Sequence, residues 1–191
     1  NDSLAGIGVP SKLFSHNDQQ STWMSLYPEG AGTGWGGRIG DVLMAANPYP
    51  VFTAMSASGN AVFLAGQRVV HYHVGSGGPV FARSLTNGAT FGSPHLKTVL
   101  ARSVVRSASS HPYEAEYAAV MARSLDTSAA LGGALATVSL PALPTAAVAL
   151  GRSANVVLAN DTLAQQLQIV ARSLTAAQRL GMRRQVFMVS L

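Results

Sequence analysis

The chain has 191 residues, of which 48% are hydrophobic and only 11% are charged, and it contains no cysteine. This length suits one domain with a sizeable core, and the lack of cysteine excludes disulfides and thiolate metal sites. The net charge of +5 arises from 13 scattered basic residues set against only 8 acidic ones, so it does not indicate a nucleic-acid-binding protein. No apolar run approaches the ~20 residues of a membrane span.

A cluster of polar residues opens the first expected helix. Ser15 and Asp18 have the Ser-x-x-Asp spacing of a capping box, which predicts a helix from about His16 to Leu26. Its apolar contacts would come from Trp23, Met24 and Leu26.

The cluster itself, Ser15-His16-Asn17-Asp18, has two interpretations. It can be an ordinary helix cap with a polar surface. Alternatively, it is a reactive site, because the free amides and positive dipole end of a helix N-terminus bind anions and stabilise an alkoxide. The residues alone leave both interpretations open.

A glycine-rich loop over 27–37 precedes a second expected helix at about Arg38–Ala46. Arg38 follows Gly34-Trp35-Gly36-Gly37 and would lie at the start of this helix. It either binds an anionic group there or is a surface arginine beside a packing Trp35.

Alternating and apolar segments predict strands at Val51–Ala57, Ala61–Ala65 and Gln67–Val74, with a further short one at Pro79–Leu85. Turns are expected at 58–60 and 75–78. His71 and His73 alternate on one face, as two metal ligands do. The alternative is an exposed or hydrogen-bonded pair, since no third ligand lies nearby in sequence.

The second half of the chain is mainly helical in pattern. Capping residues predict helices at about 94–106, 112–131 and 161–180, with a low-complexity connection over 132–155. The last helix should bury a stripe of Leu163, Leu167, Val170 and Leu174. Residues 185–191 should form an interior strand, so the expected fold class is α/β.

Four motifs, LFSHNDQQ, TGWGGRIGD, SASGNAVFLAG and AAQRLGMRRQVFMVSL, resemble in order and spacing a family of exported bacterial proteins. The family is known as domain of unknown function number 1501, and the resemblance extends from Pro10 to Leu191. It implies a fold similar to the alkaline phosphatase and sulfatase superfamily. Family members are longer at both ends, so the chain is interpreted as a middle segment of such a protein. Residues 1–191 then form a single domain segment, with the site helix and strands in 10–85 and a mainly helical part over 93–191. The fold is then incomplete at both ends.

The resemblance implies a metal-dependent hydrolase-like protein that acts on phosphate or sulfate esters. Ser15 would be the nucleophile, with His16, Asn17, Asp18 and Arg38 as candidate neighbours. A divalent metal is expected in the full-length protein, with ligands outside this chain, so that the chain alone should be inactive. By the same resemblance the protein is periplasmic or extracellular, although the sequence shows no signal peptide.

A second function class stays open beside the hydrolase. It is a non-catalytic exported protein that uses the same fold to bind a surface polymer or another partner. The expected partner is an anionic small molecule if the protein is a hydrolase and a surface polymer if it is a binding protein.

Overall fold

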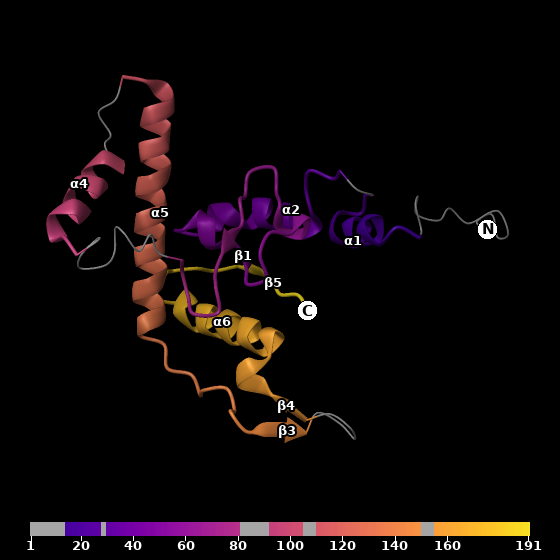
Figure 1. Cartoon of the computed structure of the whole chain (residues 1–191). Helices are drawn as coiled ribbons and strands as arrows, with labels where there is room; N and C mark the ends of the chain where they lie inside the picture. The colour runs from indigo at the N-terminus through magenta and orange to yellow at the C-terminus, as the bar shows by residue number, and fades with distance from the viewer. Residues whose placement is uncertain (1–13, 28–29, 81–91, 105–109, 150–154) are drawn as a thin grey trace. The chain divides into compact units, whose positions relative to one another are not determined.

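The computed structural model describes residues 14–27, 30–80, 92–104, 110–149 and 155–191. The fold is mixed α/β and contains a small parallel sheet (Figure 1). The described α-helices are α1 (His16–Ser25), α2 (Trp35–Leu43), α4 (Pro94–Val104), α5 (Pro112–Ala136) and α6 (Thr162–Ala177). The strands are β1 (Ala54–Ser56), β2 (Tyr72–His73), β3 (Ala147–Ala149), β4 (Asn155–Val157) and β5 (Val186–Met188). Short 3-10 turns are η2 (Met44–Ala46), η3 (Pro50–Phe52), η4 (Val62–Leu64) and η5 (Leu158–Asn160).

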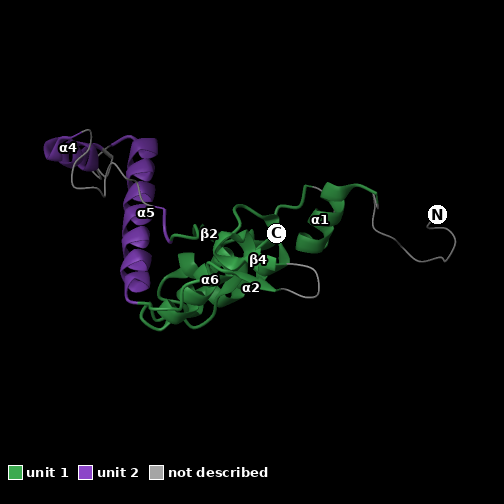
Figure 2. Cartoon of the chain, turned by 60° about the horizontal axis from the view of Figure 1, so that its bottom comes forward, with its two compact units in different colours: residues 1–77, 138–191 green, residues 78–137 purple. Residues whose placement is uncertain are grey.

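The chain forms two compact units, which Figure 2 shows in two colours. Residues 1–77 and 138–191 make the first unit, which holds the parallel sheet together with α1, α2 and α6. Residues 78–137 make the second unit, in which α4 and α5 contact each other. None of the helices in the described ranges has the length and hydropathy that crossing a bilayer requires.

The core of the first unit surrounds the central strand of the sheet. The strand order is β2-β1-β5 and both pairings are parallel. All three residues of β1 are fully buried, and Leu64 and Val69 pack in the same cluster as Ala54. Helices α2 and α6 lie on opposite sides of this sheet in the view of Figure 1. A central strand is covered on both faces, which explains why all of β1 is buried. The polar Ser56 is accommodated because its hydroxyl donates to the Gly59 carbonyl.

Strand β5 confirms the strand expected over residues 185–191, but its position within the sheet differs from the expected one. Among the described strands, β5 pairs only with β1, so it lies at the end of the sheet and is half-buried along its length. The expectation of an interior strand is therefore wrong for the described sheet. The apolar run of 186–189 is explained by packing against the Leu64 cluster, to which Val186 and Met188 contribute.

The other expected strands are shorter than the sequence pattern suggested, or absent. Val51–Ala57 contains only β1, preceded by η3, and Gln67–Val74 contains only β2. Ala61–Ala65 is the 3-10 turn η4 rather than a strand. Apolar residues are buried equally well in either conformation, so periodicity alone does not separate them. Residues 79–80 form no strand, and the rest of the expected strand at 79–85 lies outside the described residues.

The capping residues in the sequence predicted the starts of most of the helices correctly. Ser93 Oγ accepts the Leu96 amide at 3.3 Å at the start of α4, and Pro112 begins α5 as expected. Asp161 Oδ1 accepts the Ala164 amide at 2.7 Å and caps α6. Beyond α6, Gly181 takes a left-handed φ of 64° that ends the helical segment.

The segment over 132–155 departs from the expected connection. Helix α5 continues to Ala136, and β3 pairs with β4 in an antiparallel hairpin, with Val148 opposite Val156. Helix α5 runs five residues past its expected end at Leu131 although two of them are glycines, which disfavour a helix. Burial of Ala134 and Leu135 offsets that cost.

Helix α2 begins at Trp35, three residues before the expected start at Arg38, and ends in the turn η2. The early start places several glycines within the helix, on the side that meets residues 62–69. A side chain on Gly37 would overlap the carbonyl of Ala65, and one on Gly36 would meet the ring of Phe63. The glycines therefore allow α2 to approach this segment at backbone distance.

The side chain of Asn47, which follows α2, forms hydrogen bonds with the segment that leads into β5. Its Nδ2 donates to Thr53 Oγ1 at 2.9 Å and to the Arg184 carbonyl at 2.8 Å. Its Oδ1 accepts the Arg183 amide at 2.9 Å. The Asn47 side chain is buried, so these bonds satisfy groups that would otherwise be costly to bury.

Helix α6 buries a different stripe from the one expected. Ile169, Ser173 and Ala176 are buried, whereas Leu167 and Leu174 are 50% and 55% exposed. The expectation that the leucine stripe faces the core is therefore wrong for these two residues. The face that meets the core thus combines one large side chain, Ile169, with the small side chains of Ser173 and Ala176.

Alanine substitutions on the two faces of α6 should differ in their effect on stability. Ile169→Ala should lower the free energy of unfolding by about 2–5 kcal/mol, because it leaves a cavity in a fully buried site. Leu167→Ala should cost less than about 1 kcal/mol, because half of the side chain already meets solvent. Urea unfolding of both variants checks this, and an equal loss for both would contradict the observed orientation of α6.

Gly37→Ala tests the close approach of α2. The added methyl group should lower the free energy of unfolding by at least about 2 kcal/mol, because the atoms it meets are backbone and cannot move away cheaply. Gly133→Ala is the matched control: Gly133 lies within α5 with open space around it, so alanine should raise stability by about 0.5–1 kcal/mol. Opposite signs in urea unfolding are the expected result, and a neutral Gly37→Ala would refute the close approach.

Candidate functional site

Ser15 caps α1, as its sequence pattern predicts. Its backbone is extended (φ −88°, ψ 117°) and its Oγ accepts the Asp18 amide at 3.4 Å. The Ser15 carbonyl accepts the first helical bond from the Gln19 amide at 3.0 Å. The hydroxyl therefore lies among the amides of the first turn, where the helix dipole favours negative charge.

The neighbours of Ser15 in sequence divide into two kinds. His16 and Asn17 are exposed, so both side chains can reach a bound molecule. Asp18 is only 2% exposed and is already engaged within the fold. Within the described residues, no group of three or more His, Cys, Asp or Glu side chains converges as a metal site requires.

Arg38 lies at the far end of α1 from Ser15. Its Nη2 donates to the Ser25 carbonyl at 3.2 Å, and Ser25 is the last residue of the ten-residue helix. At 1.5 Å of rise per residue, the length of α1 places about 15 Å between Ser15 and Ser25. Arg38 is therefore not brought together with Ser15, and its bond to Ser25 ties α2 to the C-terminal end of α1.

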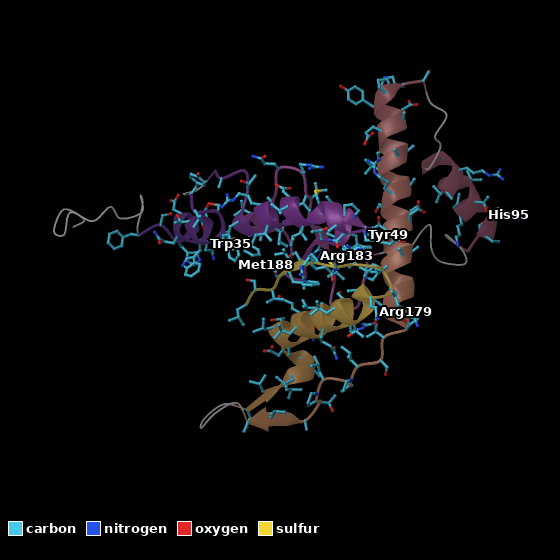
Figure 3. The ribbon with its side chains drawn as sticks, turned by 180° about the vertical axis from the view of Figure 1, so that it is seen from behind. Trp35, Tyr49, His95, Arg179, Arg183 and Met188 are labelled. Atoms are coloured by element: carbon cyan, nitrogen blue, oxygen red, sulfur yellow. The ribbon has the colours of Figure 1, made fainter. Side chains whose placement is uncertain are left out.

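An open groove of about 360 Å³ lies between α1 and α2. Its lining residues are Gln19, Thr22, Trp23, Leu26 and Trp35. Trp35 stands where α2 adjoins α1, as Figure 3 shows, and its Nε1–H donates to the Trp23 carbonyl at 3.0 Å. The ring of Trp35 also packs edge-on against Phe63 at 4.5 Å between centroids, so one wall of the groove is held firmly in place.

The groove changes the interpretation of the apolar residues of α1. Of the residues expected to supply apolar contacts, Trp23 is 79% exposed and Leu26 is 70% exposed, and both line the groove. Gln19, Thr22, Trp23 and Leu26 recur at the spacing of one helix face. That spacing is visible in the sequence, but it could not show that this face meets Trp35 rather than the core.

Asp41 organises the loop that follows η4. Its carboxylate accepts the amides of Gln67 and Val69 at 2.7 Å and the amide of Arg68 at 2.9 Å. The bond from Val69 is the largest cause that lowers the pKa of Asp41, burial opposes it, and the other two amides add to the lowering. With its lone pairs used in this way, Asp41 serves the fold rather than a metal ion.

The histidine pair at 71 and 73 matches the hydrogen-bonded alternative. His71 Nε2 lies 3.0 Å from Asn60 Oδ1, and His73 is exposed. Burial, with a smaller contribution from the charge of His73, lowers the pKa of His71. The lowered pKa favours the neutral imidazole of His71, which suits its role as a hydrogen-bonding partner of Asn60.

Comparison with known proteins gives no neighbour for the chain. No family model matches it, and neither a curated protein nor a solved structure matches it.

Asp41→Asn should lower the free energy of unfolding by about 1–3 kcal/mol at neutral pH, because a neutral amide replaces a charged acceptor of backbone amides. Since folding lowers the pKa of Asp41 below its usual value of 3.8, the stabilisation is present above that value and is lost as the pH falls through the lower folded pKa. The difference from wild type should therefore be full above about pH 5 and shrink in stronger acid.

Urea unfolding over this pH range measures the difference. Asp126→Asn is the control, because Asp126 is an exposed carboxylate on α5, and it should change stability by less than about 0.5 kcal/mol. A stability gap for Asp41→Asn that stays constant into strong acid would contradict the assignment.

Proposed function

We propose that this chain carries the nucleophile-bearing helix of an exported, metal-dependent hydrolase-like protein that acts on phosphate or sulfate esters. The observation that carries the proposal is Ser15 at the N-cap of α1, with its Oγ beside the amide of Asp18. The resemblance of the chain to exported proteins related to alkaline phosphatases and sulfatases supports the same role for Ser15. In this proposal the fold is part of an alkaline-phosphatase-like arrangement, and the protein acts in the periplasm or outside the cell.

The geometry supports a nucleophilic role in two ways. Ser15 is only partly buried, so an ester can approach its hydroxyl from solvent. A helix N-terminus also stabilises the negative charge that develops on a serine oxygen and on a bound phosphate or sulfate. The exposed side chains of His16 and Asn17 are placed to contact the same anionic group. Asp18 and Arg38 are excluded from this role because their contacts lie within the fold.

The residues around Ser15 do not by themselves fit a divalent metal. His16 is exposed, and Asp18 is buried and engaged, so they do not form the ligand set that a hydrolytic metal requires. We therefore propose that the metal ligands lie in the flanking segments that the family resemblance implies.

A non-catalytic role in binding is the second candidate function. The observation that favours it is the groove between α1 and α2, because Trp23 is 79% exposed there. Large exposed aromatic side chains beside a concave surface are typical of binding sites. In this candidate the chain binds a surface polymer and Ser15 is only a helix cap.

Ser15→Asn separates the two candidates without removing the cap. Asparagine caps helices about as well as serine, so the fold should keep its stability, but the hydroxyl nucleophile is lost. In the chain extended by the proposed flanking segments, turnover of p-nitrophenyl phosphate or sulfate should fall by about 10³-fold or more. Ser15→Thr keeps both the cap and a hydroxyl and should retain measurable turnover.

The assay includes Mg²⁺, Mn²⁺, Zn²⁺ and Ca²⁺ in separate reactions, and circular dichroism verifies that each variant is folded. Ser15→Asn with undiminished turnover would sink the nucleophile assignment. No turnover by the extended wild-type chain with any of the metals would favour the binding role instead.

A further inference from the structure

Two histidines and an asparagine lie together where β1 and β2 end. Asn60 is in the loop that follows β1, His71 immediately precedes β2, and His73 is the last residue of β2. His73 is in register with Ser56, the last residue of β1. In open α/β sheets the carboxyl ends of neighbouring parallel strands form the edge at which ligands bind. The hydrolase proposed above uses none of these side chains.

The hydrogen bond between Asn60 and His71 determines which nitrogen of His71 is free. His71 Nε2 lies 3.0 Å from Asn60 Oδ1. An amide oxygen only accepts hydrogen bonds, so the proton of the neutral ring is on Nε2 and the lone pair is on Nδ1. In the part of the chain that the structure describes, Nδ1 has no hydrogen-bond partner. A ring that is held through one nitrogen by a carbonyl oxygen, with the other nitrogen free, is typical of a histidine that binds a metal.

His73 supplies a second imidazole beside the first. Residues two apart in an extended chain point to the same face, and their Cα atoms are about 6.6 Å apart. The charge of His73 acts on His71, where it adds to the effect of burial in lowering the pKa. His73 is exposed, and its ring has no hydrogen-bond partner among the described residues. Rotation of the His73 side chain therefore brings a nitrogen toward a cation held by His71.

We propose that His71 and His73 together bind one divalent transition-metal ion, through Nδ1 of His71 and the ring of His73. Asn60 is a positioning residue, because it holds His71 in the tautomer that binds the metal. Imidazole nitrogens favour Cu²⁺, Ni²⁺ and Zn²⁺ over Mg²⁺ and Ca²⁺, which take oxygen ligands. Among the first three ions Cu²⁺ should bind most tightly.

Two protein ligands make this an open surface site. They do not enclose the ion as the four ligands of a structural zinc site do, so water completes its coordination. The inference goes beyond the proposed hydrolase, because binding here requires neither Ser15 nor the flanking segments.

Calorimetry on the 191-residue chain tests the site directly. Cu²⁺, Ni²⁺, Zn²⁺ and Mg²⁺ are titrated separately at about pH 7.5, where imidazoles are mostly neutral, in a buffer that binds no metal. One equivalent of Cu²⁺ should bind with a Kd of about 10 μM or tighter, Ni²⁺ and Zn²⁺ should bind more weakly, and Mg²⁺ should not bind. The electron paramagnetic resonance spectrum of the Cu²⁺ complex should show two nitrogen ligands. Absence of Cu²⁺ binding at about 1 mM would overturn the proposal.

His73→Ala removes one ligand at an exposed position, so the fold should be kept. Cu²⁺ binding should weaken by about tenfold or more, and the spectrum should show one nitrogen ligand fewer. His95→Ala is the matched control, because His95 is an exposed histidine of α4, and it should leave binding unchanged. An equal loss in both variants would mean that copper is spread over surface histidines, which contradicts a specific site.

Asn60→Ala tests the positioning role without removing a ligand. Loss of the oxygen that holds His71 should weaken Cu²⁺ binding by about tenfold. Asn60→Asp keeps an acceptor oxygen in this place and should restore the affinity at least to that of the wild type. Unchanged affinity in Asn60→Ala would refute the assigned tautomer of His71, and the proposal with it.

A synthetic peptide of residues 68–76 with blocked ends separates a folded site from a flexible one. The peptide contains both histidines but lacks Asn60 and the sheet. Because the fold holds His71 in place before the ion arrives, the chain should bind Cu²⁺ at least about tenfold more tightly than the peptide. Equal affinity would show that the sequence alone binds the metal, which overturns the proposal. Ester turnover plays no part in these measurements, so they test the metal site separately from the hydrolase.

Discussion

The contact of α2 with residues 62–69 is the constraint on which the first unit depends. Gly36 and Gly37 bring the helix against Phe63 and Ala65 at a distance that no side chain allows. One turn further on, Asp41 holds the amides of 67–69. This pairing sets the path of the chain into β2, and it positions Trp35 against Phe63 at the edge of the groove. The sheet, the groove and the start of α2 thus follow from one close approach.

The sequence predicts where helices begin far better than which face they bury. Caps are local: Ser15, Ser93 and Asp161 each bond an amide three residues away, and a short window contains all the information needed. Burial depends on partners far along the chain. On α6, Ile169 rather than Leu167 meets the core. The strands were predicted least well for the same reason, and Val62–Leu64 forms a 3-10 turn instead of a strand.

In the candidate site, too, local features could be predicted from the sequence and long-range ones could not. The position of Ser15 at a helix N-terminus is a local property, and the sequence predicts it. The separation of Arg38 from Ser15 is not local, because it depends on α2 meeting the last turn of α1 through the Ser25 carbonyl. The groove needs both helices to be placed before Gln19, Trp23 and Trp35 can be seen as one surface. The nucleophilic role of Ser15 is a proposal, whereas the groove is a feature of how α1 and α2 pack.

The carboxylate of Asp41 also has a consequence for the solvents in which this fold persists. Its negative charge is stabilised mainly by three backbone amides at contact distance, and the charge of Arg68 makes the smallest contribution. Dissolved ions screen charges over a Debye length of about 8 Å at physiological ionic strength, which weakens exposed ion pairs far more than contacts of this kind. The hydrogen bonds that anchor residues 67–69 should therefore weaken less with added salt than an exposed ion pair does.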